Sequence, residues 1–278
     1  MTRRELVLGA VAYDAKVVPI WEGFRAFFTA NGLPFDAVLY TNYERQVEAH
    51  LRGDIDVAWN SPLAWIETDR AARARGRRAE AIAMRDTDRD LTSVVLVRAD
   101  GPVGDARDLA GRAVGTGAAD SPQATLIPIA SLAEAGIEVR SVIHDALPGK
   151  HGDHIGGERD AVKALLAGTV DAACVIDGNR LAFAREGLFA PNALRVVHQT
   201  APYDHCNFTV LDGAPAELIA QFRALLEGMS YEDSQLRPLL DMEGLRAWLP
   251  GRTSGYALLE RAVDRSKYLD PWLSRVTA

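Results

Sequence analysis

The sequence predicts an α/β protein of two similar lobes, each with a mostly parallel sheet flanked by helices. Apolar strand-like runs alternate with amphipathic helical stretches along most of the chain, a pattern typical of sheets covered by helices. In addition, one unit occurs twice: an amphipathic helix, a glycine stop, a short apolar strand and a polar turn. Its two copies end in LRGDIDVAWNS (residues 51–61) and LAGTVDAACVIDG (residues 166–178). Two copies far apart in sequence indicate two lobes of the same design.

The first lobe begins with strand and helix periodicities in turn. Asn31-Gly32 is a typical helix end. Thr41 and Glu44 match a capping box, in which a hydroxyl and a carboxylate satisfy backbone amides at a helix start, so a helix is predicted from here to Gly53. The expected elements are, in order, a strand at 6–12, a helix at 18–31, a strand at 35–41, a helix at 43–53 and a strand at 55–59.

Two β-rich runs, residues 91–101 and 205–213, are suited to carry the chain from one lobe to the other and back. Between them, a strand, a glycine-rich turn and a helix are predicted within residues 108–136, followed by the second copy of the repeated unit. The tail is helical. We therefore expect residues 1–94 plus 203–278 in lobe 1 and residues 95–202 in lobe 2.

The composition excludes several classes of protein. Of 278 residues, 48% are hydrophobic and 25% charged, as in ordinary globular domains. A net charge of −7 argues against a nucleic-acid partner, which would require a basic face. No run approaches the roughly 18 apolar residues of a membrane helix. Cys174 and Cys206 are too few for a disulfide framework and are expected as free thiols, although one bridge would also fit.

The N-terminal residues fit a first strand better than a secretion signal. The expected location is therefore the cytoplasm, or the periplasm if a leader has been removed.

The polar turn after the strand at 55–59 raises the question of a ligand. Asn60-Ser61-Pro62 is typical of a helix start, where free backbone amides and the helix dipole favour an anion. Proline fits the first helical position, since its missing N–H costs nothing there. Asp120-Ser121-Pro122 is a second turn of the same kind. The alternative is that Asn60 or Ser61 only caps its own helix.

The chain resembles the phosphonate-binding proteins of ABC importers, and more broadly the phosphate, phosphite and phosphonate group with the type 2 periplasmic-binding-protein fold. The similarity covers residues 5–230. It implies two lobes joined by two crossing strands that close on a small ligand, with an ABC permease as partner if the protein is exported. It rests on the ordered segments GDIDVAWNSPLAWIE, DLAGRAVGTGAADSPQATLIP, GGERDAVKALLAG with VDAACVID, and APYDHCNFTVLDGAP.

The resemblance also implies which residues border the ligand. The turn after the first Asp-Ile-Asp strand carries over onto Trp59, Asn60 and Ser61, and the helix start before Leu126 carries over onto Ser121, Gln123 and Thr125. The chain departs from the family at Pro122, where a hydroxyl is usual, and at Arg159, where a histidine is usual near the second repeat. The resemblance is therefore to an atypical member of the family, and we expect no signal peptide.

Further ligand candidates follow from their places after predicted strands. Tyr13 and Asp14 follow the first strand, and Asp177 follows the strand of the second repeat. Arg159 could pair bidentately with an anion, or with a neighbouring carboxylate on the surface. Asp177 could equally cap a helix.

Histidine and cysteine supply the candidates for chemistry. The loop KHGDHIGGE, residues 150–158, matches no zinc motif, and no metal or cofactor is expected. His154, His205 and Cys206 are candidate catalytic groups. Adjacent residues of a strand point to opposite faces, so we do not expect His205 and Cys206 to form one dyad.

The favoured function is the binding of a small phosphonate-, phosphate- or carboxylate-like anion in a cleft between the lobes. The alternative is a cytoplasmic enzyme of a lyase or metabolite-modifying type on the same scaffold, which would use His, Cys and Arg side chains at the cleft.

Overall fold

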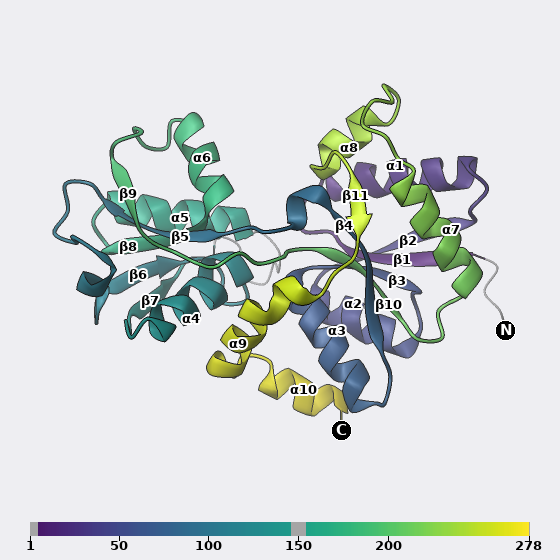
Figure 1. Ribbon diagram of the computed structural model, residues 1–278, viewed down its shortest axis with the longest axis horizontal. Coiled ribbons are helices and arrows are strands. Elements are labelled where there is room, and N and C mark those ends of the chain that lie inside the picture. The colour runs from purple at the N-terminus through teal and green to yellow at the C-terminus, as the bar shows by residue number, and fades with distance from the viewer. Residues whose placement is uncertain (1–4, 146–153, 278) are drawn as a thin grey trace. The chain divides into compact units, whose positions relative to one another are not determined.

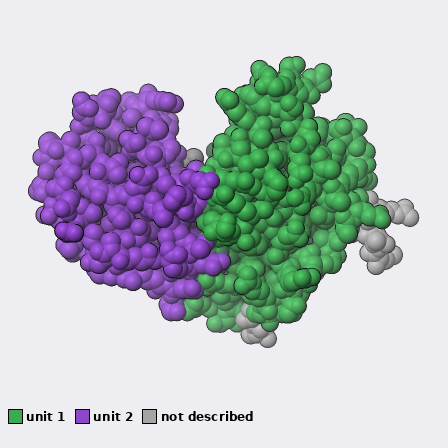
Figure 2. Space-filling model, viewed as in Figure 1, with its two compact units in different colours: residues 1–89, 204–256, 269–278 green, residues 90–203, 257–268 purple. Residues whose placement is uncertain are grey.

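The computed structural model describes residues 5–145 and 154–277, which divide into two compact units (Figures 1 and 2). Unit 1 contains the chain up to Arg89, residues 204–256 and the residues from Leu269 onward, drawn in green in Figure 2. Unit 2 contains residues 90–203 and 257–268, drawn in purple. The expected lobes were 1–94 plus 203–278 and 95–202; the structure assigns helix α9 (Ala257–Ser266) to unit 2.

Unit 1 is built on a six-stranded mixed sheet of order β11-β4-β10-β3-β1-β2. Strand β1 pairs in parallel with β2 and β3, whereas β10 runs antiparallel between β3 and β4. The strands are β1 (Leu6–Val11), β2 (Phe35–Tyr40), β3 (Val57–Asn60), β4 (Ala79–Arg85), β10 (Asn207–Leu211) and β11 (Trp248–Pro250).

Helices cover both faces of this sheet (Figure 1). Apolar side chains of β1 alternate with period two, so that Leu6, Leu8 and Ala10 join one core with α1, α7 and α8. On the other face, α2, α3 and α10 share a smaller core. The helices are α1 (Val17–Ala30), α2 (Tyr43–Arg52), α3 (Pro62–Ala74), α7 (Ala216–Glu227), α8 (Arg237–Glu243) and α10 (Asp270–Thr277), with short 3₁₀ turns at Asp86–Asp88 and Ser254–Tyr256.

The larger core of unit 1 is rich in aromatic rings. The rings of Trp59 and Phe208 lie 4.6 Å apart, and Trp248 lies 5.1 Å from Phe208 and 5.9 Å from Phe24. Such pairs contribute about 0.5–1.5 kcal/mol each beyond the burial of their area. This aromatic cluster, formed by Phe24, Trp59, Phe208 and Trp248, fixes α1 and β11 to the centre of the sheet.

Unit 2 repeats the plan with a five-stranded mixed sheet of order β7-β6-β8-β5-β9. Strand β6 pairs in parallel with β7 and β8, and β5 runs antiparallel between β8 and β9. The strands are β5 (Ser93–Arg98), β6 (Ala113–Thr116), β7 (Arg140–Ile143), β8 (Ala172–Ile176) and β9 (Leu194–Gln199). The helices are α4 (Ile127–Glu134), α5 (His154–Leu166), α6 (Asp177–Arg185) and α9, with a 3₁₀ turn at Ala106–Leu109 and one π-helical turn, η3 (Pro122–Leu126), leading into α4.

The two sheets therefore share a common core topology, in agreement with the two similar lobes predicted from the repeated unit, although both sheets are mixed and not mostly parallel. In each, three parallel strands are followed by an antiparallel strand, β10 in unit 1 and β5 in unit 2. Each of these strands lies wholly within one unit. No helix in the described parts of the chain is long and apolar enough to span a membrane.

One detail of the predicted helix starts is wrong. Helix α2 is capped by Asn42 and not by Thr41, because the Asn42 side chain accepts a hydrogen bond from the amide of Arg45 at 2.9 Å. Asparagine is as good a cap as threonine or better, so the two neighbours compete and the backbone geometry decides.

Candidate functional site

Each unit begins a helix with the same Ser-Pro pair beyond the carboxyl end of a parallel strand. In unit 1, Ser61 caps α3 after β3, and its Oγ accepts the amide of Ala64 at 3.2 Å. In unit 2, Ser121 caps η3 after β6, and its Oγ accepts the amide of Ala124 at 3.2 Å. The carboxyl ends of parallel strands are where ligands of α/β sheets bind, so each of these helix starts is a candidate anion site in its own unit.

The caps leave one first-turn amide at each start. Pro62 and Pro122, at the first position of each turn, have no N–H. The serine hydroxyls accept hydrogen bonds from the amides at the third position, those of Ala64 and Ala124. The remaining amides are those of Leu63 and Gln123, in the same position of each turn. A helix start carries about half a positive charge, so each can hold an anion without a basic side chain.

The start in unit 2 has an unusual backbone. The amide of Leu126 donates to the carbonyl of Ser121 at 3.0 Å, which closes a π-type turn before α4 begins. Single π turns inside helices occur frequently at functional sites. The side-chain oxygen of Gln123 in this turn is buried and has no hydrogen-bond partner in residues 5–145 and 154–277.

The remaining predicted residues of this segment are bound internally. The Thr125 hydroxyl donates to the carbonyl of Ala118 at 2.7 Å. Ser121 is fully buried, and its hydroxyl serves as the cap. This start therefore offers main-chain groups and Gln123 more readily than hydroxyls.

Asn60 lies inside unit 1. It has no exposed surface, its Nδ2 donates to the Thr209 hydroxyl at 2.8 Å, and its Oδ1 accepts from the Gln46 side chain at 2.8 Å. The capping role that the sequence offered for Asn60 or Ser61 belongs to Ser61. The Asn60 side chain joins β3 to α2 and β10.

Trp59 belongs to the aromatic cluster, and the guanidinium of Arg85 lies 5.3 Å from its ring centre. Tyr13, just past β1, is half-buried. Burial, with smaller effects of Glu243 and Cys206, raises the pKa of Tyr13 to about 12. Asp14 is exposed and accepts the amide of Lys16 at 2.8 Å, at the start of α1.

Arg159 and Asp177 each have an internal partner. Arg159 pairs with Glu186 at 2.5 Å and stacks over the Phe183 ring at 4.5 Å. Asp177 accepts a hydrogen bond from Arg180, one helical turn on, at 2.7 Å. Both side chains remain about one third exposed, 32% and 34%, so a ligand could compete for either.

The histidine-rich loop falls mostly outside the described residues. His151 and Asp153 lie there, and the side chain of His154 is likewise not described, although helix α5 begins at His154.

His205 and Cys206 do contact each other, so the expectation that they point apart is wrong. The Cys206 Sγ lies 3.1 Å from Nδ1 of His205. The alternation of a strand does not apply, because β10 begins only at Asn207. Cys174 and Cys206 are both free and buried.

Several charged residues of unit 1 that the sequence did not single out lie beside this pair. Arg85, at the end of β4, forms a bidentate ion pair with Asp88 at 2.6 and 2.8 Å and reaches Glu243 at 3.2 Å. The sequence feature that could have identified Arg85 and Asp88 is the polar run Arg85–Asp88 at the end of an apolar strand. The same feature led to the prediction of Asn60 and Ser61 as ligand contacts.

The pKa values show how strongly these groups interact. Burial tends to raise the pKa of Asp88, but the Arg85 guanidinium and hydrogen bonds from Arg85 and His205 outweigh it and lower the value to about 2. Burial raises the pKa of Glu243 to about 7, and burial likewise holds the pKa of Cys206 well above its usual range.

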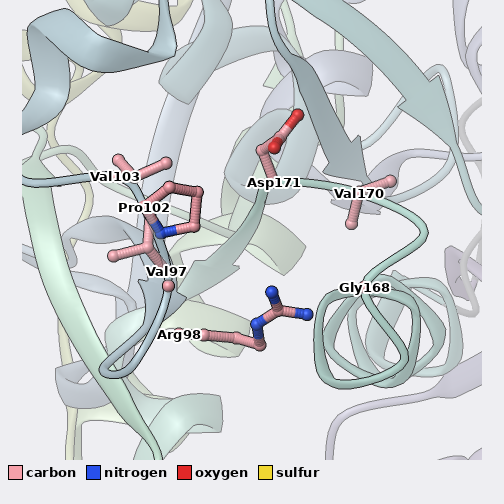
Figure 3. A pocket seen from close by; sticks show the side chains of 8 residues that line it. Val97, Arg98, Pro102, Val103, Gly168, Val170 and Asp171 are labelled. Carbon is pink, nitrogen blue, oxygen red and sulfur yellow. The ribbon is translucent and has the colours of Figure 1, made fainter.

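Figure 3 shows a pocket in unit 2, between the end of β5 and the residues that precede β8. Its cavity of about 60 Å³ is lined by Arg98 at the end of β5 and by Gly168, Val170 and Asp171, which precede β8. Gly168 has φ +73°, and a Cβ there would lie 2.6 Å from the Arg98 guanidinium. This pocket lies at the amino ends of the parallel strands, away from the Ser121 turn, and we do not assign a ligand to it.

Comparison with known proteins identifies the family. A family model described as "ABC transporter, phosphonate, periplasmic substrate-binding protein" matches residues 13–256. Among curated proteins, none matches the sequence.

Solved structures share the fold at low sequence identity. PhnD1 from Prochlorococcus marinus, in complex with methylphosphonate, aligns with a TM-score of 0.70 and 16% identity, over 95% of this chain and 98% of that one. XAC2383 from Xanthomonas citri, bound to ATP, gives 0.73 and 16%, over 96% and 99%. The aliphatic sulphonate binding protein SsuA from Escherichia coli gives 0.60 and 17%, over 98% and 94%. With a family model that spans most of its length, this chain belongs to the phosphonate-type periplasmic substrate-binding proteins of ABC transporters.

Proposed function

We propose that this protein binds a small phosphonate-, phosphate- or carboxylate-like anion through the helix starts at Ser61 and Ser121. The observation that carries the proposal is that both units present the same Ser-Pro start, with the same 3.2 Å cap, beyond a parallel strand. Membership of a phosphonate-binding family supports it. The net charge of −7 gives no general attraction for anions, so the affinity has to come from local amides.

Gln123 suggests a further property of the ligand. Its buried side-chain oxygen has no partner in the described residues, and an unpartnered buried polar atom costs about 1–3 kcal/mol. A ligand with a hydroxyl or amine near its anionic group would satisfy this oxygen. Tyr13, Asp14, Arg159 and Asp177 remain proposed contacts for the rest of the ligand.

The proposed partner is an ABC permease, as in the family. The expected cytoplasmic location remains a prediction, and cell fractionation with a periplasmic marker tests it. A periplasmic location would support an ABC permease as the partner, whereas a cytoplasmic location would rule it out.

Calorimetric titration with methylphosphonate, phosphate, methanesulfonate and acetate tests the binding proposal. We would replace Ser61 or Ser121 with Asp, because aspartate caps a helix as well as serine does but places a negative charge beside the proposed anion. Two like charges 4 Å apart repel by about 4 kcal/mol at an effective dielectric constant of about 20, so each change should weaken binding at least tenfold.

Ser230→Asp controls for the added charge alone. Ser230 is an exposed serine of unit 1 whose hydroxyl accepts the amide of Glu232 at 3.2 Å, and its replacement should leave affinity unchanged. Equal affinity of Ser61→Asp, Ser121→Asp and the wild type for the bound anion would reject the assignment, and failure of every anion to bind would reject the function.

A further inference from the structure

Three metal-ligating side chains converge on one point in unit 1. The carboxylate of Asp88, the ring of His205 and the thiol of Cys206 each place a donor atom within 4.8 Å of the other two. Nδ1 of His205 lies 3.1 Å from the Cys206 Sγ and 3.5 Å from Oδ1 of Asp88. Asp88 and Cys206 are buried, and the His205 side chain is 21% exposed.

The backbone holds these groups in place. Asp88 ends the 3₁₀ turn that follows β4, whereas His205 and Cys206 directly precede β10. The two segments are joined where the amide of His205 donates to the carbonyl of Asp88 at 2.8 Å. Arg85 orients the Asp88 carboxylate through hydrogen bonds to both of its oxygens.

The geometry does not suit a catalytic relay. In a Cys–His–Asp relay, the thiol and the carboxylate bind different nitrogens of the imidazole. Here both approach the same atom, Nδ1 of His205. The carboxylate therefore cannot orient the ring for proton transfer from the thiol.

The same geometry suits a tetrahedral ion. Zinc bonds of about 2.3 Å to sulfur and about 2.0–2.2 Å to nitrogen and oxygen imply donor atoms roughly 3.3–3.6 Å apart. Two of the three observed separations, 3.1 and 3.5 Å, lie close to this range, and the third, between the donor atoms of Asp88 and Cys206, is at most 4.8 Å. Second-shell hydrogen bonds to ligating carboxylates, such as those from Arg85 here, are the rule in metal sites.

We propose that Asp88, His205 and Cys206 form a binding site for a zinc-like divalent cation. Three protein ligands leave the fourth position to water or an anionic oxygen, and the partly exposed face of His205 provides access. On binding, the Cys206 thiol releases its proton to solvent and binds the metal as thiolate.

Titration of the full chain with cobalt(II), a spectroscopic substitute for zinc, tests the site. We expect one equivalent to bind, with a thiolate-to-cobalt charge-transfer band that zinc abolishes by displacement. Cys206→Ser should remove the band, and His205→Gln should weaken cobalt binding at least tenfold. His205 is partly exposed, so its replacement should leave the fold intact, as circular dichroism would show.

Two controls isolate the site. Cys174→Ser removes the other buried thiol, and His151→Ala with His154→Ala removes the histidine-rich loop as a competing ligand source. Both should retain the band. Absence of cobalt uptake by the wild type, a band that persists in Cys206→Ser, or a band lost in either control would overturn the proposal.

Discussion

The side chain of Asn60 at the end of β3 donates a hydrogen bond of 2.8 Å to the hydroxyl of Thr209 in the neighbouring strand β10. The Thr209 hydroxyl donates a hydrogen bond to the Asn207 side-chain oxygen at 2.6 Å, and the Asn60 oxygen accepts one from Gln46 of α2. All four residues are buried. Buried polar networks of this kind are costly to break, because each deletion leaves partners unsatisfied.

Replacing Asn60 with Ala should therefore destabilise unit 1. The change leaves the Gln46 amide and the Thr209 hydroxyl short of a partner, and we expect a loss of about 2–3 kcal/mol. Urea unfolding followed by circular dichroism measures it, with Asn192→Ala, at an exposed position, as control. Unchanged stability together with lost anion affinity would instead show that Asn60 contacts the ligand.

Glu243 should make the protein less stable as the pH rises. Burial raises its pKa to about 7, so the folded state binds its proton more tightly than the unfolded state. Its contribution is fully present below about pH 4.5 and is lost as pH rises through about 7. The free energy of unfolding of Glu243→Gln, relative to that of the wild type, should rise by roughly 3 kcal/mol between pH 4 and 8. Unfolding free energies across this range test it. Glu227→Gln, on the surface of α7, should show no such trend.

His50 should act in the opposite direction. The ring is buried, and burial lowers the pKa of His50 to about 4, although the backbone of Asp56 acts in the opposite direction. The unfolded state then binds the proton more tightly, so stability is lost as pH falls from about 6.5 to 4. The free energy of unfolding of His50→Leu, relative to that of the wild type, should rise by up to about 3 kcal/mol as the pH falls through this range. A difference independent of pH would show that His50 titrates normally in the folded state.

Two glycines should respond oppositely to the same substitution. A Cβ at Gly255 would lie 2.1 Å from the carboxyl carbon of Asp204, which forms a bidentate ion pair with Arg252. Gly255→Ala should thus cost several kcal/mol, in the range for damaged buried ion pairs. A Cβ at Gly178 in α6 meets nothing within 4 Å, and Gly178→Ala should stabilise by about 0.5–1 kcal/mol. The melting temperatures of both variants test this prediction. A lower melting temperature for Gly178→Ala as well would contradict the conclusion that a side chain fits at Gly178.

Local sequence patterns predicted the fold well, because the repeated unit of helix, glycine stop, strand and turn is found in both compact units. The left-handed Gly53 and Gly168 end the two repeated helices as expected. Element ends were harder: Thr41 and Asn42 are both good caps, and the sequence does not distinguish them. The placement of α9 with unit 2 depends on contacts with α4, far away in sequence.

The candidate site was predictable only where it is made of main chain. A Ser-Pro start follows from two neighbouring residues, and both such starts were identified. Whether a polar side chain turns inward, as Asn60 does, depends on partners such as Gln46 and Thr209 that only the folded sheet brings near. The grouping of Asp88 with His205 and Cys206 likewise depends on the pairing of segments more than a hundred residues apart.

The distribution of tryptophan along the chain has a practical consequence. All five tryptophans, Trp21, Trp59, Trp65, Trp248 and Trp272, belong to unit 1. Tryptophan fluorescence therefore reports on unit 1 alone, provided that the excitation wavelength is too long to excite tyrosine. Comparing that emission with a signal from the whole backbone would show whether the halves melt together or one after the other, without attaching any dye.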